Sequence, residues 1–339
     1  DEREAERRRI HAIGVDRWPN DARFRRAGGE VQRNGLWILR ESARSDAVGK
    51  RLADNVRDLL KVVPAPADST PPPVLGPLGL PWRGASRSGN IVVVSMTSPE
   101  EADRVAKHCT VAVTLFNLVF GVEAEVPPDL TLALGRGPED LQRGLENAGV
   151  PEAERRRRKD AAGSWWPELR CMFDASASPA ARLESAVRIT VNLLRKRTFG
   201  DFGRLGWVRE GFGTYLTWLV CGTRLGSWRR MGAPTASDTG WGPSRDLGDD
   251  WLAHARRLAA KGKLPELAYV VAVDHDAMTE SDLLAAYAFA VYLTTGWPGR
   301  LPRFLHVANS GKDTPDAAVE VFGLTLPRRA PPVPPRRAG

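Results

Sequence analysis

The sequence has little of the chemistry that usually marks a metal site or a disulfide-rich protein. It holds three cysteines and five histidines among 339 residues. Cys109, Cys171 and Cys221 lie in apolar stretches without metal-ligand spacing, and we expect them to be small buried hydrophobic residues. An odd count excludes a framework in which every cysteine is paired, although one bridge stays open.

Long apolar runs are missing as well. No segment reaches the roughly 18 uninterrupted apolar residues of a membrane-spanning helix, so we expect no transmembrane segment. The chain begins at Asp1 rather than Met, which is consistent with a removed signal peptide. The compartment stays open, with secretion and the cell envelope among the alternatives.

Common catalytic signatures are also absent. The sequence has no Gly-x-Ser-x-Gly elbow, no phosphate-binding glycine loop and no Cys-His nucleophile pattern. Ser-His-Asp catalysis stays open, because those residues are scattered along the chain. Two partial metal sites exist: Asp250 with His254, at helical i, i+4 spacing, and the run 274–276 (Asp-His-Asp). Neither completes a ligand set, so we expect no metal and no cofactor.

Positive charge is in excess, with a formal net charge of +8. Much of it is local, in the block 155–159 and in the Pro/Arg-rich tail after Leu326. These blocks fall in expected loops and lack the interleaved aromatic residues of a single-strand binder. Nucleic acid is therefore a weak candidate partner. Binding of an anionic polymer through residues 155–159 and Arg336-Arg337 remains a third hypothesis.

The hydrophobic pattern predicts an α+β fold, in which a mixed sheet leads into a mainly helical half. Strands are expected at 36–41, 90–95, 130–134 and 168–173. Helices are expected at 43–62, 98–120, 138–148, 180–198, 206–222, 248–261, 280–295, 299–309 and 314–322. Residues 63–88 are rich in Pro, Gly and Ser and predict a linker or irregular loop. The expected divisions are an N-terminal region 1–87 with one βα unit, a domain 88–325 and a tail 326–339.

Two segments of the helical half bear on function. Residues 188–194 read Arg-Ile-Thr-Val-Asn-Leu-Leu, and residues 207–215 read Trp-Val-Arg-Glu-Gly-Phe-Gly-Thr-Tyr, so eighteen positions separate Asn192 from Glu210. With the later helix around Tyr287, this order resembles the gluzincin-type zinc peptidases of the thermolysin-like fold. The match is nearest to bacterial peptidase-like domains with a βαβα lead-in, and it covers about residues 89–325.

The resemblance implies a zinc site that has lost its ligands. In such peptidases, H-E-x-x-H on one helix supplies two zinc ligands and a general base, and a second helix supplies a Glu as third ligand. Arg188, Ile189 and Asn192 stand at the positions of His, Glu and His; Glu210 is the retained ligand, and Tyr287 is expected near the site. Arginine offers no lone pair and repels a cation, and isoleucine cannot take a proton from water.

The favoured function is therefore a non-catalytic peptidase-like protein with a binding, assembly or structural role, and with protein as its partner. Arg188 and Glu210 are expected to pair in the relic site. The alternative is an active hydrolase that uses a relocated metal or another catalytic constellation. It also stays open that residues 183–197 are an ordinary core helix and that Glu210 only favours a helix N-terminus. Eleven Trp, with Trp165-Trp166 the most conspicuous pair, could anchor a partner or lie in the core.

Overall fold

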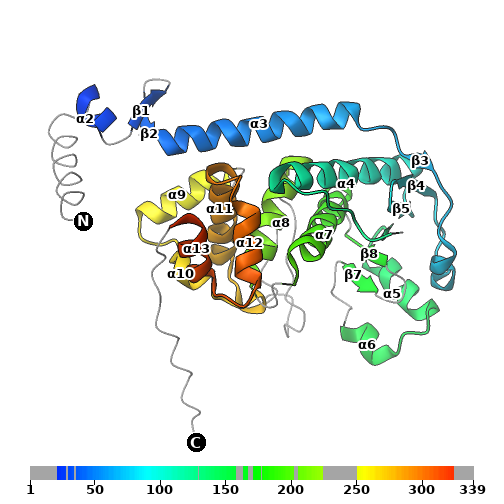
Figure 1. The fold of residues 1–339 in the computed structure, drawn as a ribbon. Coiled ribbons are helices and arrows are strands. Elements are labelled where there is room, and N and C mark those ends of the chain that lie inside the picture. The colour runs from blue at the N-terminus through cyan, green and yellow to red at the C-terminus, as the bar shows by residue number, and fades with distance from the viewer. Residues whose placement is uncertain are drawn as a thin grey trace, which may run out of the picture.

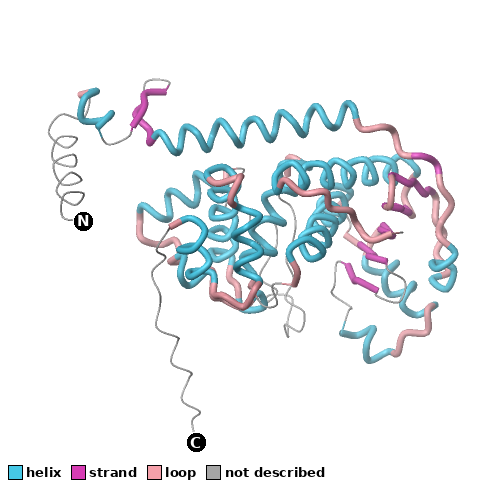
Figure 2. Tube along the Cα trace, viewed as in Figure 1, coloured by secondary structure: helices cyan, strands magenta, loops and turns pink. Residues whose placement is uncertain are grey.

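The computed structural model describes residues 21–27, 30–33, 36–128, 130–157, 163–166, 171–176, 178–201, 205–223 and 250–323. The expected Pro/Arg-rich tail 326–339 lies outside these ranges, as do most of residues 1–34. The structure is α+β, as the sequence predicts, with a mixed sheet at one end of the molecule and a set of helices at the other (Figures 1 and 2). Within the described ranges, no helix is long and apolar enough to cross a membrane.

The six-stranded sheet has the order β3-β4-β5-β6-β8-β7. Its strands are β3 (Ala67–Asp68), β4 (Gly84–Ser88), β5 (Ile91–Ser95), β6 (Leu130–Leu134), β7 (Gly163–Trp166) and β8 (Cys171–Asp174). The three central strands β5, β6 and β8 are parallel, and the remaining pairs are antiparallel. Every residue of β5 and of β6 is buried, which explains their continuous apolar sequence.

Three stretches differ from the expectation. Residues 63–88 are not an irregular linker throughout, because β3 and β4 join the sheet and η1 (Pro73–Leu78) forms a short 3₁₀ helix. Residues 163–166, around the Trp165-Trp166 pair, form the edge strand β7; the side chains of that pair lie outside the description. The basic block was expected in a loop, but residues 155–157 belong to the helix α6 (Glu152–Arg157). Local composition misses the strands among these elements because pairing with neighbouring strands, rather than propensity, forms them.

Helices lie on both faces of the sheet, and two separate hydrophobic clusters fill the space between the helices and the sheet. The larger cluster contains α4 (Pro99–Phe120) and α7 (Pro179–Phe199), and the smaller contains η1 and α5 (Pro138–Asn147). The side chain of Ser98 accepts a hydrogen bond from the Glu101 N–H, and Pro99 is the first residue of α4. This cap fixes the start of α4 where the sequence predicts it.

The helical half follows the predicted order closely. It comprises α8 (Gly206–Cys221), α9 (Trp251–Ala260), α10 (Leu267–Val270), η3 (His275–Ala277), α11 (Glu280–Gly296), α12 (Leu301–Asn309) and α13 (Thr314–Phe322). The short elements α10 and η3 were not expected. Trp207 is fully buried against Phe212, Phe289 and Phe304, so this Trp belongs to the core and cannot anchor a partner.

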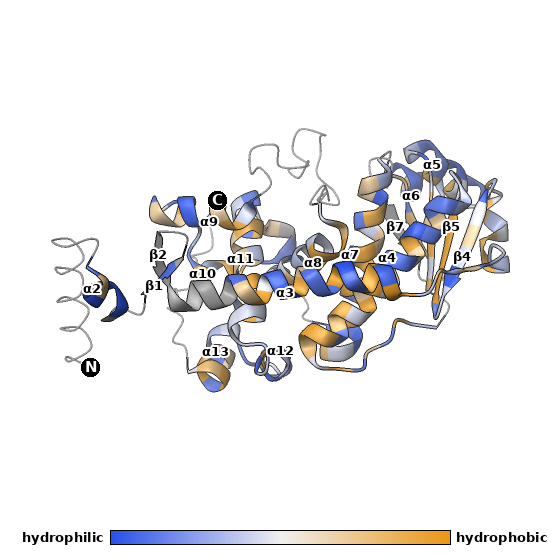
Figure 3. Cartoon of the chain, turned by 90° about the horizontal axis from the view of Figure 1, so that it is seen from above, coloured by the Kyte–Doolittle hydropathy of each residue, from blue (hydrophilic) through white to orange (hydrophobic). Residues whose placement is uncertain are grey.

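The N-terminal elements are α2 (Ala22–Ala27), β1 (Glu30–Arg33), β2 (Leu36–Leu39) and α3 (Arg40–Val62), with β1 and β2 paired antiparallel. The long helix α3 lies along the body and contacts α4, α8 and α11 (Figure 1). Figure 3 shows hydrophilic and hydrophobic residues mixed along it. Leu52 and Val56 of α3 are buried in the larger core.

Candidate functional site

The helices α7 and α8 pack against each other, and one face of α7 brings polar side chains to the contact. Glu184, Arg188, Asn192 and Arg195 follow one another at spacings of four, four and three residues, which places them on one helical face. Gly213 of α8 faces two of them, because a Cβ there would lie in van der Waals contact with the Asn192 amide, at 3.4 Å, and with Arg188 Cγ, at 3.6 Å. The polar face of α7 therefore lies directly over α8.

Glu210 is the centre of this contact, and three cationic or ionisable side chains surround it. The Arg188 Nη1 atom lies 3.7 Å from Glu210 Oε2, Arg209 Nε lies 3.4 Å from Oε1, and His275 Nε2 lies 3.1 Å from Oε1. We call these four residues the Glu210 cluster. The Glu210 side chain is only 4% exposed. The expected ion pair between Arg188 and Glu210 is therefore present.

The neighbours decide the charge of Glu210. Burial by itself would raise the pKa of this carboxyl group. The hydrogen bond with His275 and the charges of Arg188 and Arg209 act in the opposite direction, and together they hold the pKa of Glu210 below its ordinary value. Glu210 is consequently an ionised, buried carboxylate at neutral pH, compensated by basic side chains.

His275 reaches Glu210 because η3 is fixed over the start of α8. Leu205 and Asp274 form an isolated antiparallel bridge. Gly206 then leaves no space between the two segments, since a Cβ there would lie 2.8 Å from the His275 Cα atom. The sequence indicates His275 only as a member of the partial metal site at residues 274–276. Its contact with Glu210 spans 65 positions, and no local pattern indicates it.

The other expected site residues are placed as follows. Asn192 and Arg188 lie together over α8, whereas Ile189 packs against the larger hydrophobic core. Tyr287 of α11 is buried, and its ring contacts are with Tyr215 at 5.9 Å and with Trp251 at 5.3 Å between centroids. These contacts place the Tyr287 ring against side chains of α8 and α9.

The two partial metal sites have other roles in the structure. Asp250 caps α9 by accepting a hydrogen bond from the Ala253 N–H, and His254 Nδ1 lies 3.3 Å from Arg257 Nη2. His275 is engaged by Glu210, and the Asp276 side chain lies outside the description. Across the described part of the chain, no three His, Cys, Asp or Glu side chains are grouped so as to hold a metal ion.

The cysteines are free thiols. Cys109 and Cys171 are buried, as expected, and burial raises the pKa of each thiol to about 12. Cys221 is half-buried, and burial raises its pKa as well. None of the three is a thiolate at neutral pH, so none has the ionisation state of a catalytic nucleophile.

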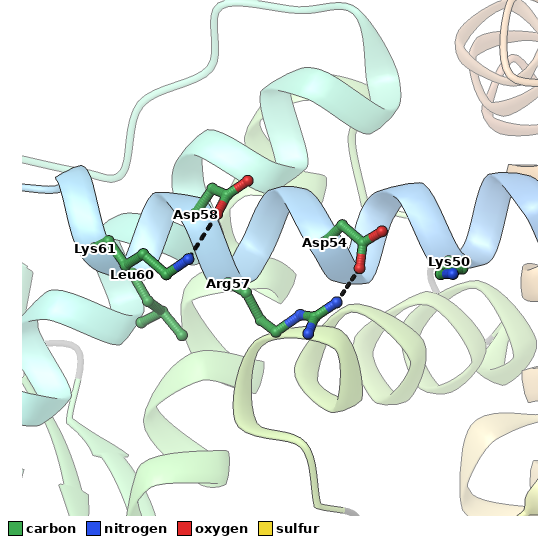
Figure 4. A pocket seen from close by; sticks show the side chains of 6 residues that line it. All are labelled: Lys50, Asp54, Arg57, Asp58, Leu60 and Lys61. Atoms are coloured by element: carbon green, nitrogen blue, oxygen red, sulfur yellow. Dashed lines mark hydrogen bonds and ion pairs between the residues drawn. The ribbon is translucent and has the colours of Figure 1, made fainter.

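A surface hollow of about 740 Å³ lies along α3 and is unrelated to Glu210. Its lining residues are Lys50, Asp54, Arg57, Asp58, Leu60 and Lys61 (Figure 4). Arg57 pairs with Asp54, and Lys61 pairs with Asp58 at 3.0 Å. Exposed ion pairs of this kind contribute little to stability. Because these charged side chains pair with one another, they do not form a set of groups directed at one ligand.

Comparison with known proteins gives no family for this chain: no protein-family model, curated protein or solved structure matches it.

Proposed function

We propose that this chain is a non-catalytic, peptidase-like protein that binds a protein partner. The observation that carries the proposal is the contact between Arg188 and Glu210 across α7 and α8. In the zinc peptidases that the sequence resembles, the corresponding helices supply the zinc ligands. Here the same two positions hold a cation and the carboxylate that compensates it.

The donor set supports the loss of metal chemistry. A zinc site needs lone pairs from imidazole, thiolate or carboxylate groups. Of the three expected ligand positions, Arg188 has no lone pair to give and Asn192 offers only an amide oxygen. The remaining ligand, Glu210, is already engaged by Arg188, Arg209 and His275. A zinc ion would have to displace these basic side chains from Glu210, and it would gain only the Glu210 carboxylate as a ligand.

The hydrolase alternative is favoured by one contact, between His275 and Glu210. A buried carboxylate that holds an imidazole by a 3.1 Å hydrogen bond fixes the orientation of the ring, as in a catalytic triad. The His275 side chain remains 13% exposed, so a substrate could reach it. This hypothesis requires cleavage that is insensitive to chelators and is lost in His275→Gln.

One experiment separates these functions. The purified chain is incubated with a random peptide library, with and without zinc and a chelator, and free and protein-bound peptides are separated by gel filtration and sequenced by mass spectrometry. We expect intact peptides in the bound fraction and no cleavage products. Cleavage that a chelator abolishes would establish a metallopeptidase, and chelator-insensitive cleavage lost in His275→Gln would establish the alternative.

A further inference from the structure

The long helix α3 is attached to the rest of the molecule by few buried side chains. Among its described side chains only Leu52 and Val56 are buried, while Val48, Leu59 and Leu60 are half-buried against the same larger cluster. The helices α8 and α11, which α3 contacts, are instead buried along nearly their whole length. Because stability follows the apolar area that is buried, we expect α3 to open before α8 and α11.

The apolar side of α3 defines what the surface beneath it accepts. Val48, Leu52, Val56 and Leu60 recur at intervals of four residues, so they lie along one side of the helix. The helix contacts α4 from the sheet half and α8 and α11 from the helical half (Figure 1). We call the surface that α4, α8 and α11 present to α3, including Tyr215, the α3 docking surface. It fits an amphipathic helix.

One buried hydroxyl group has no partner while α3 is docked. The Tyr215 hydroxyl oxygen is buried and has no hydrogen-bond partner among the residues that the structure describes. Gly49 of α3 lies over it, since a Cβ at Gly49 would be 4.0 Å from this oxygen. A buried polar group without a partner opposes the state that buries it, and displacement of α3 would give the hydroxyl group access to water. Tyr215 therefore weakens the docking of α3.

The charged side chains of α3 stabilise the helix itself. Arg57 pairs with Asp54, and Lys61 pairs with Asp58, so both ion pairs join residues three positions apart on the same helix (Figure 4). Pairs at this spacing support an isolated helix. These two interactions remain when α3 leaves the docking surface, so displacement does not require the helix to unfold.

The connections of α3 to its surroundings also permit displacement. An ion pair between Asp46 of α3 and Arg256 of α9 has a distance of 3.8 Å, and its side chains are 44% and 63% exposed. Exposed pairs of this kind contribute little to stability. At the other end, residues 63–66 (Val-Pro-Ala-Pro) separate α3 from β3. The two prolines prevent α3 from continuing towards the sheet, so α3 is a separate unit.

We propose that α3 is a displaceable strap and that a protein partner places an amphipathic helix on the α3 docking surface instead. The inference rests on the proposed function for one point, that the ligand is a protein. The occupant is a helix because α3 shows what this surface accepts. Apolar residues at intervals of four along one side are the pattern that the partner helix must reproduce.

Native-state hydrogen exchange of the full chain tests the displacement. We expect the amides of residues 46–62 to exchange at least about 100-fold faster than those of α11, through an opening that leaves the rest of the chain folded. Tyr215→Phe removes the hydroxyl group and should slow the exchange of α3 at least about five-fold. Tyr292→Phe is the matched control on α11, because Tyr292 is 44% exposed. It should change the exchange of α3 less than about two-fold.

A labelled peptide with the sequence of residues 40–62 is the probe for the docking surface, measured by fluorescence anisotropy. In the wild type the strap competes from within the same chain, so binding should be weak. Leu52→Ala/Val56→Ala in the full chain weakens the strap and leaves the docking surface unchanged, so the peptide should bind at least about ten-fold more tightly. Asn55→Ala, exposed on the same helix, should change the affinity less than about two-fold.

The proposal is overturned if α3 exchanges no faster than α11, or if Tyr215→Phe and Tyr292→Phe have equal effects. It is also overturned if the folded double variant binds the peptide no more tightly than the wild type. A wild-type dimer that the added peptide dissociates, measured by gel filtration, would overturn it as well, because the occupant is then a second copy of the chain. The exchange measurement on the wild type decides the displacement even where the double variant does not fold.

Failure of this proposal is distinguishable from failure of the proposed function. None of the substitutions alters the Glu210 cluster. Cleavage of the peptide library would refute the proposed function and would leave the exchange of α3 unchanged. Conversely, an α3 that opens only with the whole fold would refute the strap and would not produce cleavage.

Discussion

At the scale of single residues, two buried carboxylates show that neighbours rather than depth determine ionisation. Burial raises the pKa of Asp174, at the end of β8, to about 6, although the Ser176 N–H donates to it at 2.8 Å. Glu210 is equally buried, but its basic neighbours hold its pKa below the ordinary value. The two groups therefore affect stability in opposite pH directions.

Asp174 gives the first prediction. Because its folded-state pKa is raised, its stabilising effect is complete below the unfolded pKa and is lost as pH rises towards and through about 6. Asp174→Asn removes this titration and keeps an oxygen for the Ser176 N–H. Between pH 4.5 and 7.5, the free energy of unfolding of the variant should gain about 2 kcal/mol relative to the wild type. Urea melts at both pH values measure it, with the exposed Asp58→Asn as control; an unchanged difference contradicts the prediction.

The ion pair between Arg188 and Glu210 gives the second prediction. Arg188→Met and Glu210→Gln should each destabilise the fold, because each strands buried groups of the other sign. Their combined loss should fall short of the sum by about 1–3 kcal/mol. The pKa of Glu210 is lowered, so this coupling should be present above the unfolded pKa and disappear as pH falls through the folded value.

A denaturant-melt cycle measures this coupling, and Arg188→Met combined with the distant Asp58→Asn serves as the additive control. Strict additivity of Arg188→Met and Glu210→Gln at neutral pH would show that Arg188 does not stabilise Glu210. The carboxylate would then depend on His275 and Arg209 alone.

At the scale of elements, α8 is held so closely between its neighbours that glycine is required along it. A Cβ on Gly211 would lie 2.5 Å from the Ala286 carbonyl oxygen of α11 and 3.0 Å from its carbon. Gly206 faces η3 in a similar way, because a Cβ there would lie 2.8 Å from the His275 Cα atom. The backbone of α8 thus closely approaches α11 and η3, and the approach to η3 brings Glu210 to His275.

Gly211 gives the third prediction. Gly211→Ala should destabilise the fold by about 1–3 kcal/mol, because α8 and α11 must separate to admit the methyl group. Gly296→Ala is the matched control at the exposed end of α11, where a Cβ meets only Tyr292 Cε2, at 4.0 Å. Helix propensity should leave the control unchanged or up to about 0.5–1 kcal/mol more stable. Equal effects in the two variants, measured by thermal and denaturant unfolding, would show that the close approach is not a constraint.

The sequence predicts elements that carry their own signals and misses those formed by partners. The helices α7, α9, α12 and α13 follow apolar periodicity, and the strand β5 is a buried run of mostly β-branched residues, so both are visible locally. The strands β4 and β7 contain Gly, Ser and Trp with no alternation, and only pairing with β5 and β8 forms them. The same limit applies to the site: Arg188 and Glu210 are linked by motif spacing, whereas His275 arrives through the fold.

At the scale of the whole molecule, α7 joins the two halves of the structure. Near its N-terminus, Arg182 forms a buried ion pair at 2.6 Å with Glu101 of α4, and Glu101 in turn accepts a hydrogen bond from Ser95 of the strand β5. The middle of α7 carries Arg188 and Asn192 onto α8. A helix fixed at one end by the sheet and at the other by α8 gives the side chains between them a defined position. The molecule therefore holds a preformed polar contact, which is the feature that a zinc site would require.

Restoration of zinc ligands is the fourth prediction and a test of this scaffold. In Arg188→His/Asn192→His, two imidazoles and Glu210 would present three ligands from α7 and α8, the set that a tetrahedral zinc site with one open position requires. We expect zinc binding with a Kd near or below about 1 µM, a binding free energy of about 8 kcal/mol, by isothermal titration. Adding Glu210→Gln should weaken it at least about ten-fold. Adding Ile189→Glu should lower stability, because Ile189 packs against the core.

If the double variant folds by circular dichroism and binds no zinc, the spacing between α7 and α8 is not that of a zinc peptidase, and the resemblance fails at the level of the fold.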